Sequence, residues 1–345
     1  MRFVPALCFA LIALLSISPV CAQLGAVAGV HDPAIARVNG NYYVFSTGGG
    51  VQIRKSRDLI TWERAGRVFE QLPEWAMKEV PGARGPWAPD VSFFNGRWHL
   101  YYSVSTYGSR RSCIGLATNV TLDPADAKYR WVDHGMVLET RQTDDWNAID
   151  ANVVLDESGT PWLSLGSFWG GLKIVRLDAS TGMPSKADGG LRPIARRPKP
   201  GAIEAPFIIR RGEFYYLFAS FDYCCKRAES TYNIRVGRSR AVVGPYVDRD
   251  GKPMLEGGGT MVVQGAGTIR GPGHNAVLQE PDRDWLVHHF YDAADAGRPK
   301  LQVRPMTWDE AGWPVAGEPV AKPPPTTAAA TTTTATSTTT TQPGR

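Results

Sequence analysis

The sequence predicts an all-β protein, a five-bladed β-propeller, and three observations lead to this fold class. One unit recurs five times along the chain: a polar ionisable residue, a short β-type run, a turn, and a strand with an aromatic residue near its head. The units begin at intervals of roughly 60 residues, and a near-constant period in an all-β sequence is typical of a propeller with one blade per repeat. No segment has to form a long helix.

The turns within the five units support hairpins. Four of the five turns contain glycine, which accepts the positive φ of a tight hairpin turn. The runs around the turns are rich in Val, Ile, Phe and Tyr and alternate little, as is typical of strands buried on both faces. The units run from His31 to Thr47, Trp87 to Ser105, Ile149 to Ser167, Ile203 to Ser220 and Gly273 to Phe290, and "VQIRKSRDL", "SCIGLAT", "GLKIVRLD" and "NIRVGRS" are plausible third strands.

Both ends of the chain differ from its middle. Residues 1–22 combine Arg2 with an apolar run too short to span a bilayer and a small-residue site around Ala22, which predicts a secretory signal peptide. Residues 321–345 are rich in Thr and Pro and are expected to form a disordered tail or linker, because they cannot bury a core. The sequence therefore predicts one propeller domain over residues 23–320 in a secreted protein.

Charge and cysteine content narrow the classes of partner. The formal net charge is +5 and the basic residues are scattered, which argues against nucleic-acid binding; we also expect no membrane partner and a monomer. Cys113, Cys224 and Cys225 remain after the signal peptide. Either a bridge between the neighbours Cys224 and Cys225 or a bridge that involves Cys113 is possible in an oxidising compartment.

The lead residues of the five units are predicted to meet. The first strand of each propeller blade lines the central axis, so a polar residue at its start faces the axial funnel. Carboxylates at close range raise one another's pKa, and such clusters mark functional sites. The lead residues are Asp32, Asp90, Asp150, Glu204 and His274.

The chain resembles glycoside hydrolase family 43, and within that family the arabinanases that cut α-1,5-linked arabinan. The resemblance extends from about His31 to Pro314 and implies a five-bladed propeller that hydrolyses internal bonds of arabinan, a pectin side chain, with inversion. It depends on the order and spacing of "HDPAI", "GPWAPDV", "NAIDANVV", "GSFWGGLKIVRL", "IEAPFI", "FDYCC", "YNIRVGRS", "GPGHNAV" and "LQVRPMTWDEAGWP".

The resemblance implies a role for four of the lead residues. Asp32 in "HDP" matches the family's general base, Glu204 in "IEAP" its general acid, and Asp150 in "IDAN" the third carboxylate that tunes the acid. His274 in "GPGHN" matches the histidine that faces a cation through water near the funnel floor, usually assigned as calcium. An inverting glycosidase needs its two carboxyl groups roughly 6.5–9.5 Å apart. An ionised Asp150 is expected to keep Glu204 protonated by repulsion.

Aromatic and amide side chains near the lead motifs are the candidates for sugar contacts. Flat rings stack on the apolar faces of sugars. We expect Trp87, Phe168, Asn147 and Asp90 to contact substrate, whereas Trp169 is as consistent with the core as with the sugar. His31 is adjacent to Asp32 and is expected to point the other way, with a packing or orienting role and not a catalytic one. Trp98, Trp162, Tyr215 and Trp285 lie mid-strand and are predicted core residues.

The sequence leaves two alternatives open. The first is an exo-acting α-L-arabinofuranosidase or β-xylosidase on the same fold, because the sequence does not show whether the loops close a pocket or leave a groove. The motifs "GPGHN" and "YNIRVGRS" favour the endo-acting enzyme. The second is a sugar-binding propeller without activity. A lectin has no need of an intact acid and base, and all three carboxylates are present.

Overall fold

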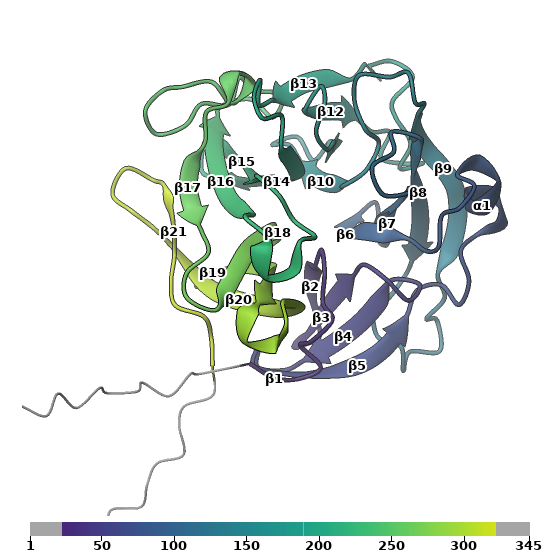
Figure 1. Cartoon of the computed structure of the whole chain (residues 1–345). Coiled ribbons are helices and arrows are strands. Elements are labelled where there is room, and N and C mark those ends of the chain that lie inside the picture. The colour runs from purple at the N-terminus through teal and green to yellow at the C-terminus, as the bar shows by residue number, and fades with distance from the viewer. Residues whose placement is uncertain (1–22, 189, 322–345) are drawn as a thin grey trace, which may run out of the picture.

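Five β-sheets surround a central axis in the computed structural model of the chain (Figure 1). The structure describes residues 23–188 and 190–321. The predicted all-β, five-bladed propeller is confirmed. The predicted signal peptide, residues 1–22, and all but the first residue of the predicted tail lie outside the described residues.

Each blade is an antiparallel sheet of four strands in chain order, with β1 (Leu24–Gly25) added at the outer edge of the first blade. Blade I holds β2 (Ala34–Val38), β3 (Asn41–Ser46), β4 (Gln52–Ser56) and β5 (Thr61–Arg67). Blade II holds β6 (Trp87–Phe94), β7 (Arg97–Val104), β8 (Ser112–Asn119) and β9 (Val132–Thr140). Blade III holds β10 (Asn152–Leu155), β11 (Pro161–Leu165), β12 (Leu172–Arg176) and β13 (Arg192–Ala195).

The remaining two blades follow the same order. Blade IV holds β14 (Ile203–Arg211), β15 (Phe214–Phe221), β16 (Asn233–Ser239) and β17 (Thr260–Val263). Blade V holds β18 (Ile269–Gln279), β19 (Asp284–Asp292), β20 (Arg298–Trp308) and β21 (Pro314–Ala316). The described residues also include the short helix α1 (Glu74–Glu79) and the 3₁₀ turns η1 (Arg227–Glu229), η2 (Met254–Glu256) and η3 (Ala293–Asp295). None of the described helices is long and apolar enough to cross a membrane.

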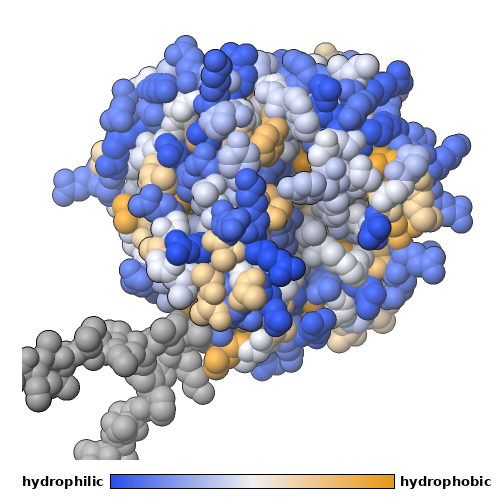
Figure 2. All heavy atoms as spheres, viewed as in Figure 1, coloured by the Kyte–Doolittle hydropathy of each residue, from blue (hydrophilic) through white to orange (hydrophobic). Residues whose placement is uncertain are grey.

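The first strand of every blade lies at the axis, as predicted. The inner strands β2, β6, β10, β14 and β18 contact one another in sequence, and β18 closes the ring by contacting β2 (Figure 1). Polar and charged side chains cover most of the face seen in Figure 2, with apolar side chains scattered among them. Because the inner strands lie side by side around one axis, they all begin at the same end of the propeller.

Apolar clusters fill the spaces between neighbouring blades. Trp162 and Tyr215 pack together between blades III and IV, and Trp285 packs with Trp62 between blades V and I. Three of the four predicted core aromatics are buried, whereas Trp98 is half-buried and packs on Phe93 with the ring centroids 5.1 Å apart. Burial of each such ring stabilises the fold by about 1.5–3 kcal/mol, so the blades are held together mainly by these clusters.

The N-terminal segment closes the ring between blades I and V. Strand β1 pairs in parallel with β5, and the chain then binds blade V, where Leu301 donates its N–H to the Val27 carbonyl (2.9 Å). The guanidinium of Arg54, 1 % exposed, donates to the carbonyl of Ala26 at 2.7 Å. This segment bridges the first and last blades.

Asp90 lies in a cavity of about 300 Å³ that is lined by residues from all five inner strands. This cavity is called the second cavity, to distinguish it from the candidate active site. Its carboxyl accepts hydrogen bonds from Ser92 Oγ (2.7 Å), Asn152 Nδ2 (3.0 Å) and the Val153 N–H (3.2 Å). Burial raises the pKa of Asp90 to about 6, although these three donors favour the charged form. At pH values between 3.8 and about 6, the folded protein thus retains a proton on Asp90 that the unfolded chain releases.

Asp90→Asn should change how stability depends on pH. The pKa of Asp90 is raised from 3.8 to about 6, so the folded state binds more protons than the unfolded state within this window and loses stability as the pH rises. We expect the unfolding free energy of the wild type, relative to Asp90→Asn, to fall by about 3 kcal/mol between pH values near 3.5 and 7. Urea unfolding at both pH values measures this slope; the offset is not diagnostic, because the new amide also meets the Asn152 donor. A difference that does not vary with pH would refute the assignment.

Candidate active site

Each inner strand has a residue in the left-handed backbone conformation, either just before the strand (β2 and β10) or within it (β6, β14 and β18). Non-glycine residues rarely adopt this conformation, so five such residues at matching places mark one repeated structural position. These residues are Asp32, Ala88, Asp150, Ala205 and His274, with φ of 51°, 42°, 61°, 53° and 48°. They align the short motifs "DPAI", "APDV", "DANV", "APFI" and "HNAV".

The neighbouring blade holds each left-handed residue in place. In every case the backbone N–H of the residue donates to a side chain of the preceding blade, and blade V precedes blade I. The acceptors are His289 Nδ1 for Asp32 (3.1 Å), Thr47 Oγ1 for Ala88 (2.7 Å), Ser103 Oγ for Asp150 (3.0 Å), Asp150 Oδ2 for Ala205 (3.2 Å) and Ser220 Oγ for His274 (2.7 Å). Such contacts stabilise a backbone conformation that is otherwise costly.

This alignment corrects the predicted convergence of the five lead residues. Asp90 lies two residues beyond the left-handed Ala88, which corresponds to a rise of about 6–7 Å along an extended strand. It is therefore in the second cavity and not beside Asp32, and the expectation that it lies with the other lead residues was wrong. Glu204 precedes the left-handed Ala205 and does reach the first cavity.

The first cavity, of about 610 Å³, brings together three carboxyl groups: Asp32 from blade I, Asp150 from blade III and Glu204 from blade IV. Each of these residues is less than 10 % exposed. The cavity is also lined by the other predicted site residues, namely Trp87, Asn147, Phe168, Trp169 and His274. Side chains that lie far apart in the sequence thus share one site.

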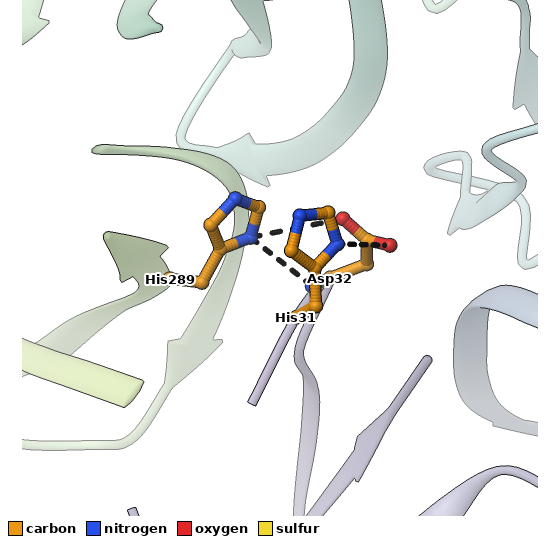
Figure 3. A group of neighbouring side chains, drawn as sticks. All are labelled: His31, Asp32 and His289. Atoms are coloured by element: carbon orange, nitrogen blue, oxygen red, sulfur yellow. Dashed lines mark hydrogen bonds and ion pairs between the residues drawn. The ribbon is translucent and has the colours of Figure 1, made fainter. Parts of the chain in front are cut away.

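Asp32 is surrounded by hydroxyl and imidazole groups. Its Oδ2 accepts from Thr47 Oγ1 (2.6 Å) and lies 2.8 Å from His31 Nδ1, and its Oδ1 lies 3.1 Å from His274 Nδ1. Figure 3 shows the His31 ring beside this carboxylate and His289 on the other side of the ring, so the expectation that His31 points away from Asp32 was wrong. Burial alone raises the pKa of Asp32, but His31 and His274 outweigh burial and hold this pKa well below its usual range. Asp32 is therefore built to stay ionised.

His274 responds to the same contact in the opposite direction. Burial lowers its pKa, whereas Asp32 and the other two carboxyl groups raise it, with a net rise to about 9. The Nδ1 atom of His274 faces Asp32. The attraction between His274 and Asp32 therefore offsets the cost of burying both side chains.

Glu204 is held by two hydroxyl groups. Oε2 accepts from Ser167 Oγ at 2.6 Å, and Oε1 accepts from the hydroxyl of Tyr232. Tyr232 can approach because Gly273 has no side chain: a Cβ there would lie 1.9 Å from the tyrosine ring. Burial and the nearby carboxyl groups raise the pKa of Tyr232, so its hydroxyl remains a donor.

The surroundings of Asp150 shift its pKa in the opposite direction to that of Asp32. Burial raises the pKa of Asp150 well above its usual value, His274 opposes this, and repulsion from Glu204 and Asp32 adds to it. Its Oδ2 accepts from the N–H of Ala205, the residue after Glu204. This side of the cavity is therefore built to retain a proton.

Aromatic side chains line the cavity and its edge. The rings of Phe168 and Tyr223 are 6.1 Å apart, and the guanidinium of Arg110 lies 5.4 Å from the ring of Trp169. Trp169 is 42 % exposed, which excludes the buried core position considered for it, and Tyr107 is 82 % exposed. Tyr107 was not among the site residues predicted from the sequence. The motifs "STYG" and "SFWG" each follow the second strand of a blade, and this parallel could have identified Tyr107.

Cys224 and Cys225 form a disulfide bond, and Cys113 is buried and free, which resolves the two pairings left open. Both half-cystines line the cavity, and so does Lys226. Sequence reasoning placed neither cysteine in the site. Position alone could have suggested it, because "DYCC" follows the second strand of blade IV as "FWGG" follows that of blade III.

The residues near His274 offer limited support for a hard cation. The next residue, Asn275, is 2 % exposed and both polar atoms of its amide are without a partner among the described residues, so an ion or its hydration shell would satisfy them. His31, Asp32 and His289 place one ligand atom each within 4.8 Å of one another. That nitrogen-rich group suits a transition metal better than calcium, which prefers oxygen. The donors thus fit calcium only through bound water.

Comparison with known proteins identifies the family that this chain resembles. The family model "Glycosyl hydrolases family 43" matches residues 26–314. An extracellular endo-α-(1→5)-L-arabinanase of Bacillus subtilis is 40 % identical, with 83 % of this chain and 87 % of that protein covered. The exo-1,5-α-L-arabinanase from a bovine ruminal metagenomic library is 47 % identical with a TM-score of 0.81, covering 86 % and 99 % of the two chains.

A third relative was solved with an oligosaccharide. The α-L-arabinanase of Cellvibrio cellulosa complexed with arabinohexaose is 41 % identical with a TM-score of 0.81, and the alignment covers 84 % of this chain and 96 % of that one. The resemblance expected from the motifs is confirmed over nearly the whole propeller. This chain therefore belongs to glycosyl hydrolases family 43.

Proposed function

We propose that this protein is a secreted enzyme that hydrolyses internal α-1,5-L-arabinofuranosidic bonds of arabinan with inversion. The observation that carries the proposal is the cavity in which carboxyl groups from blades I, III and IV meet. The substrate is taken from the relatives, which are named for their action on arabinan. We infer a monomer whose partner is a polysaccharide and not a nucleic acid or a membrane.

Asp32 acts as the general base in this proposal. Its low pKa keeps the carboxylate ionised, and Thr47 and His31 fix the orientation of Oδ2. Asp32 takes a proton from a water molecule as that water attacks the anomeric carbon from the side opposite to the leaving oxygen. Inversion follows from this single displacement.

Glu204 acts as the general acid and protonates the leaving oxygen. The proton comes from the pair that Glu204 forms with Asp150, whose raised pKa reflects burial and carboxyl repulsion. The sequence predicted an ionised Asp150 that keeps Glu204 protonated, but the raised pKa lies on Asp150 itself. Asp150 also positions Glu204, because it binds the N–H of the adjacent Ala205.

Exo action is the second candidate, and relatives support both modes. The endo reading follows from the motifs "GPGHN" and "YNIRVGRS", whereas the relative from the ruminal library is named an exo-arabinanase. Trp87 and Phe168 in the cavity, with Trp169 and Tyr107 at its edge, would bind successive sugar rings by stacking. A non-catalytic lectin ranks below both, because it gives no reason for three carboxyl groups in one cavity.

A hydrated calcium ion, or another cation, is proposed near His274 and Asn275 at the funnel floor. The unpartnered amide of Asn275 supports a bound ion there. When bound, the ion would supply fixed positive charge and ordered water. His274 would have to be neutral on the side that faces it, so ion and proton compete.

Substitution of the carboxyl groups tests the assigned roles. Asp32→Asn and Glu204→Gln should each lower the rate on arabinan by about 10²–10⁴-fold, the usual contribution of general acid–base catalysis. Asp150→Ala should keep the fold and slow arabinan more than a nitrophenyl arabinoside, whose good leaving group needs less protonation. Reducing-sugar assays and circular dichroism measure rate and fold. Asp90→Asn, from the second cavity, is the matched control and should hydrolyse arabinan at the wild-type rate. An unchanged rate in Asp150→Ala would refute the role of Asp150.

The product profile from linear arabinan distinguishes the two modes of cleavage. An endo enzyme should release oligomers of many lengths early, because it cuts at any internal bond. Chromatography of the products over time measures this. Early release of one small product alone, with fast hydrolysis of a nitrophenyl arabinoside, would instead establish exo cleavage; binding of arabinan without any release of reducing sugar would establish a lectin.

Removal of the cation should lower the melting temperature. A ligand that binds only the folded state stabilises it in proportion to the logarithm of its free concentration. We expect calcium chloride added to EDTA-treated protein to raise the melting temperature by about 4 °C, which corresponds to roughly 2 kcal/mol in a domain of this size. His274→Gln is the comparison variant and should respond less. The same melting temperature with calcium and with EDTA would exclude the site.

A further inference from the structure

The Cys224–Cys225 disulfide lies in the wall of the proposed active site. The two residues follow β15, whose last residue, Phe221, pairs with Ile203 next to Glu204. Cys224 is half-buried and Cys225 is exposed, so solvent reaches the bond. A crosslink between sequence neighbours closes the shortest possible loop, and stabilisation of the whole fold by a disulfide grows with loop length. Its main effect is therefore local.

A chain of hydrogen bonds joins this disulfide to Asp32. The N–H of Cys225 donates to Tyr291 Oη (2.9 Å), Tyr291 Oη lies 2.7 Å from His31 Nε2, and His31 Nδ1 lies 2.8 Å from Asp32 Oδ2. Because Tyr291 accepts from Cys225, its own proton is free to point at His31 Nε2. His31 then carries its proton on Nδ1 and donates it to Asp32. The Tyr291 hydroxyl also lies 3.8 Å from Cys225 Sγ, but sulfur is a weak acceptor and the contact with His31 Nε2 is much shorter.

Packing leaves the middle of this chain little freedom. Tyr291 is 3 % exposed, and its ring meets that of His289 edge-on with the centroids 5.3 Å apart. His31 stacks on the same His289 ring at 4.0 Å. A shift of Tyr291 is therefore passed directly to His31.

The outer end of the chain depends on an unusual backbone. Asp222, Cys225 and Arg227 have φ of 67°, 67° and 54°, which side chains other than glycine rarely adopt. Lys226 donates its N–H to Ser230 Oγ (3.0 Å), which anchors the loop after the disulfide. The bond between the two sulfurs restrains the peptide whose N–H reaches Tyr291. Opening the bond frees that peptide to rotate away.

We propose that the Cys224–Cys225 disulfide positions the Asp32 carboxylate through Tyr291 and His31, and that its reduction slows hydrolysis without unfolding the propeller. The proposal rests on the role of Asp32 as general base. Cys224 and Cys225 are positioning residues in this account. The pocket is thereby sensitive to thiol reductants.

The redox step needs an external dithiol. One thiolate attacks a sulfur of the disulfide, the S–S bond breaks, and the second thiol resolves the mixed disulfide. The dithiol loses two electrons and two protons and becomes a disulfide, and Cys224 and Cys225 become two thiols. Dithiothreitol serves as the probe, and peptide mapping after alkylation verifies the target.

The test compares kcat and KM on linear arabinan before and after dithiothreitol. We expect kcat to fall roughly tenfold, as a small misplacement of a catalytic group would cause, with KM changed less than twofold and the melting temperature unchanged. The double variant Cys224→Ser/Cys225→Ser should match the reduced enzyme and ignore dithiothreitol. Cys113→Ser should respond like the wild type, because Cys113 is not the target. Reoxidation should restore the rate.

Tyr291→Phe identifies the route of the effect. This variant lacks the hydroxyl that links Cys225 to His31, so its kcat should already be low and dithiothreitol should lower it no further, a non-additive result. The proposal would be overturned if dithiothreitol lowered kcat by the same factor in the wild type and in Tyr291→Phe. A rise in KM alone, which indicates direct sugar contact, would also overturn it. So would a fully active Cys224→Ser/Cys225→Ser variant. Failure of the untreated wild type to hydrolyse arabinan would instead refute the proposed function.

Discussion

The contact between each inner strand and the preceding blade is the constraint on which the site depends. Each inner strand has, just before it or within it, a left-handed residue whose N–H is bound by the neighbouring blade. This kink turns the side chain of Asp32 or Asp150 into the cavity, whereas a regular strand would direct side chains alternately to its two faces. Register shifts at Glu204/Phe207 and Gly273/Ala276 show that the ladder bends at the same level in blades IV and V.

Identical side chains at equivalent positions acquire different properties from their neighbours. Asp32 and Asp150 both occupy the left-handed position and are both buried. Two imidazoles contact Asp32 and lower its pKa, whereas Asp150 lies near Glu204 and its pKa is raised. Position in the repeat therefore brings a carboxyl group to the axis, and the partners from adjacent blades decide whether it accepts or retains a proton.

Periodicity predicted the fold well because blades repeat in sequence. The Asn39-Gly40 turn lies between β2 and β3 as expected, with positive φ at both residues. Convergence was predicted correctly for the residues at or next to the kink, and wrongly for Asp90, because an approximate period of 60 residues does not resolve a shift of two. Tyr232 and Tyr291 could not be predicted, because their roles depend on packing between blades and not on local pattern.

The closure of the ring has a consequence for biogenesis. Residues 27–29 pair with Pro299 and Leu301, so the ends of this contact are roughly 270 residues apart in the chain. On a ribosome or at a translocation pore the early blades emerge first, and the contact that completes the circle forms only after nearly all of the domain has emerged. Until then the apolar face of blade I that packs against blade V lacks its partner and is open to chaperones or to aggregation. The surface between the first and last blades is therefore the last packing surface of the domain to be completed.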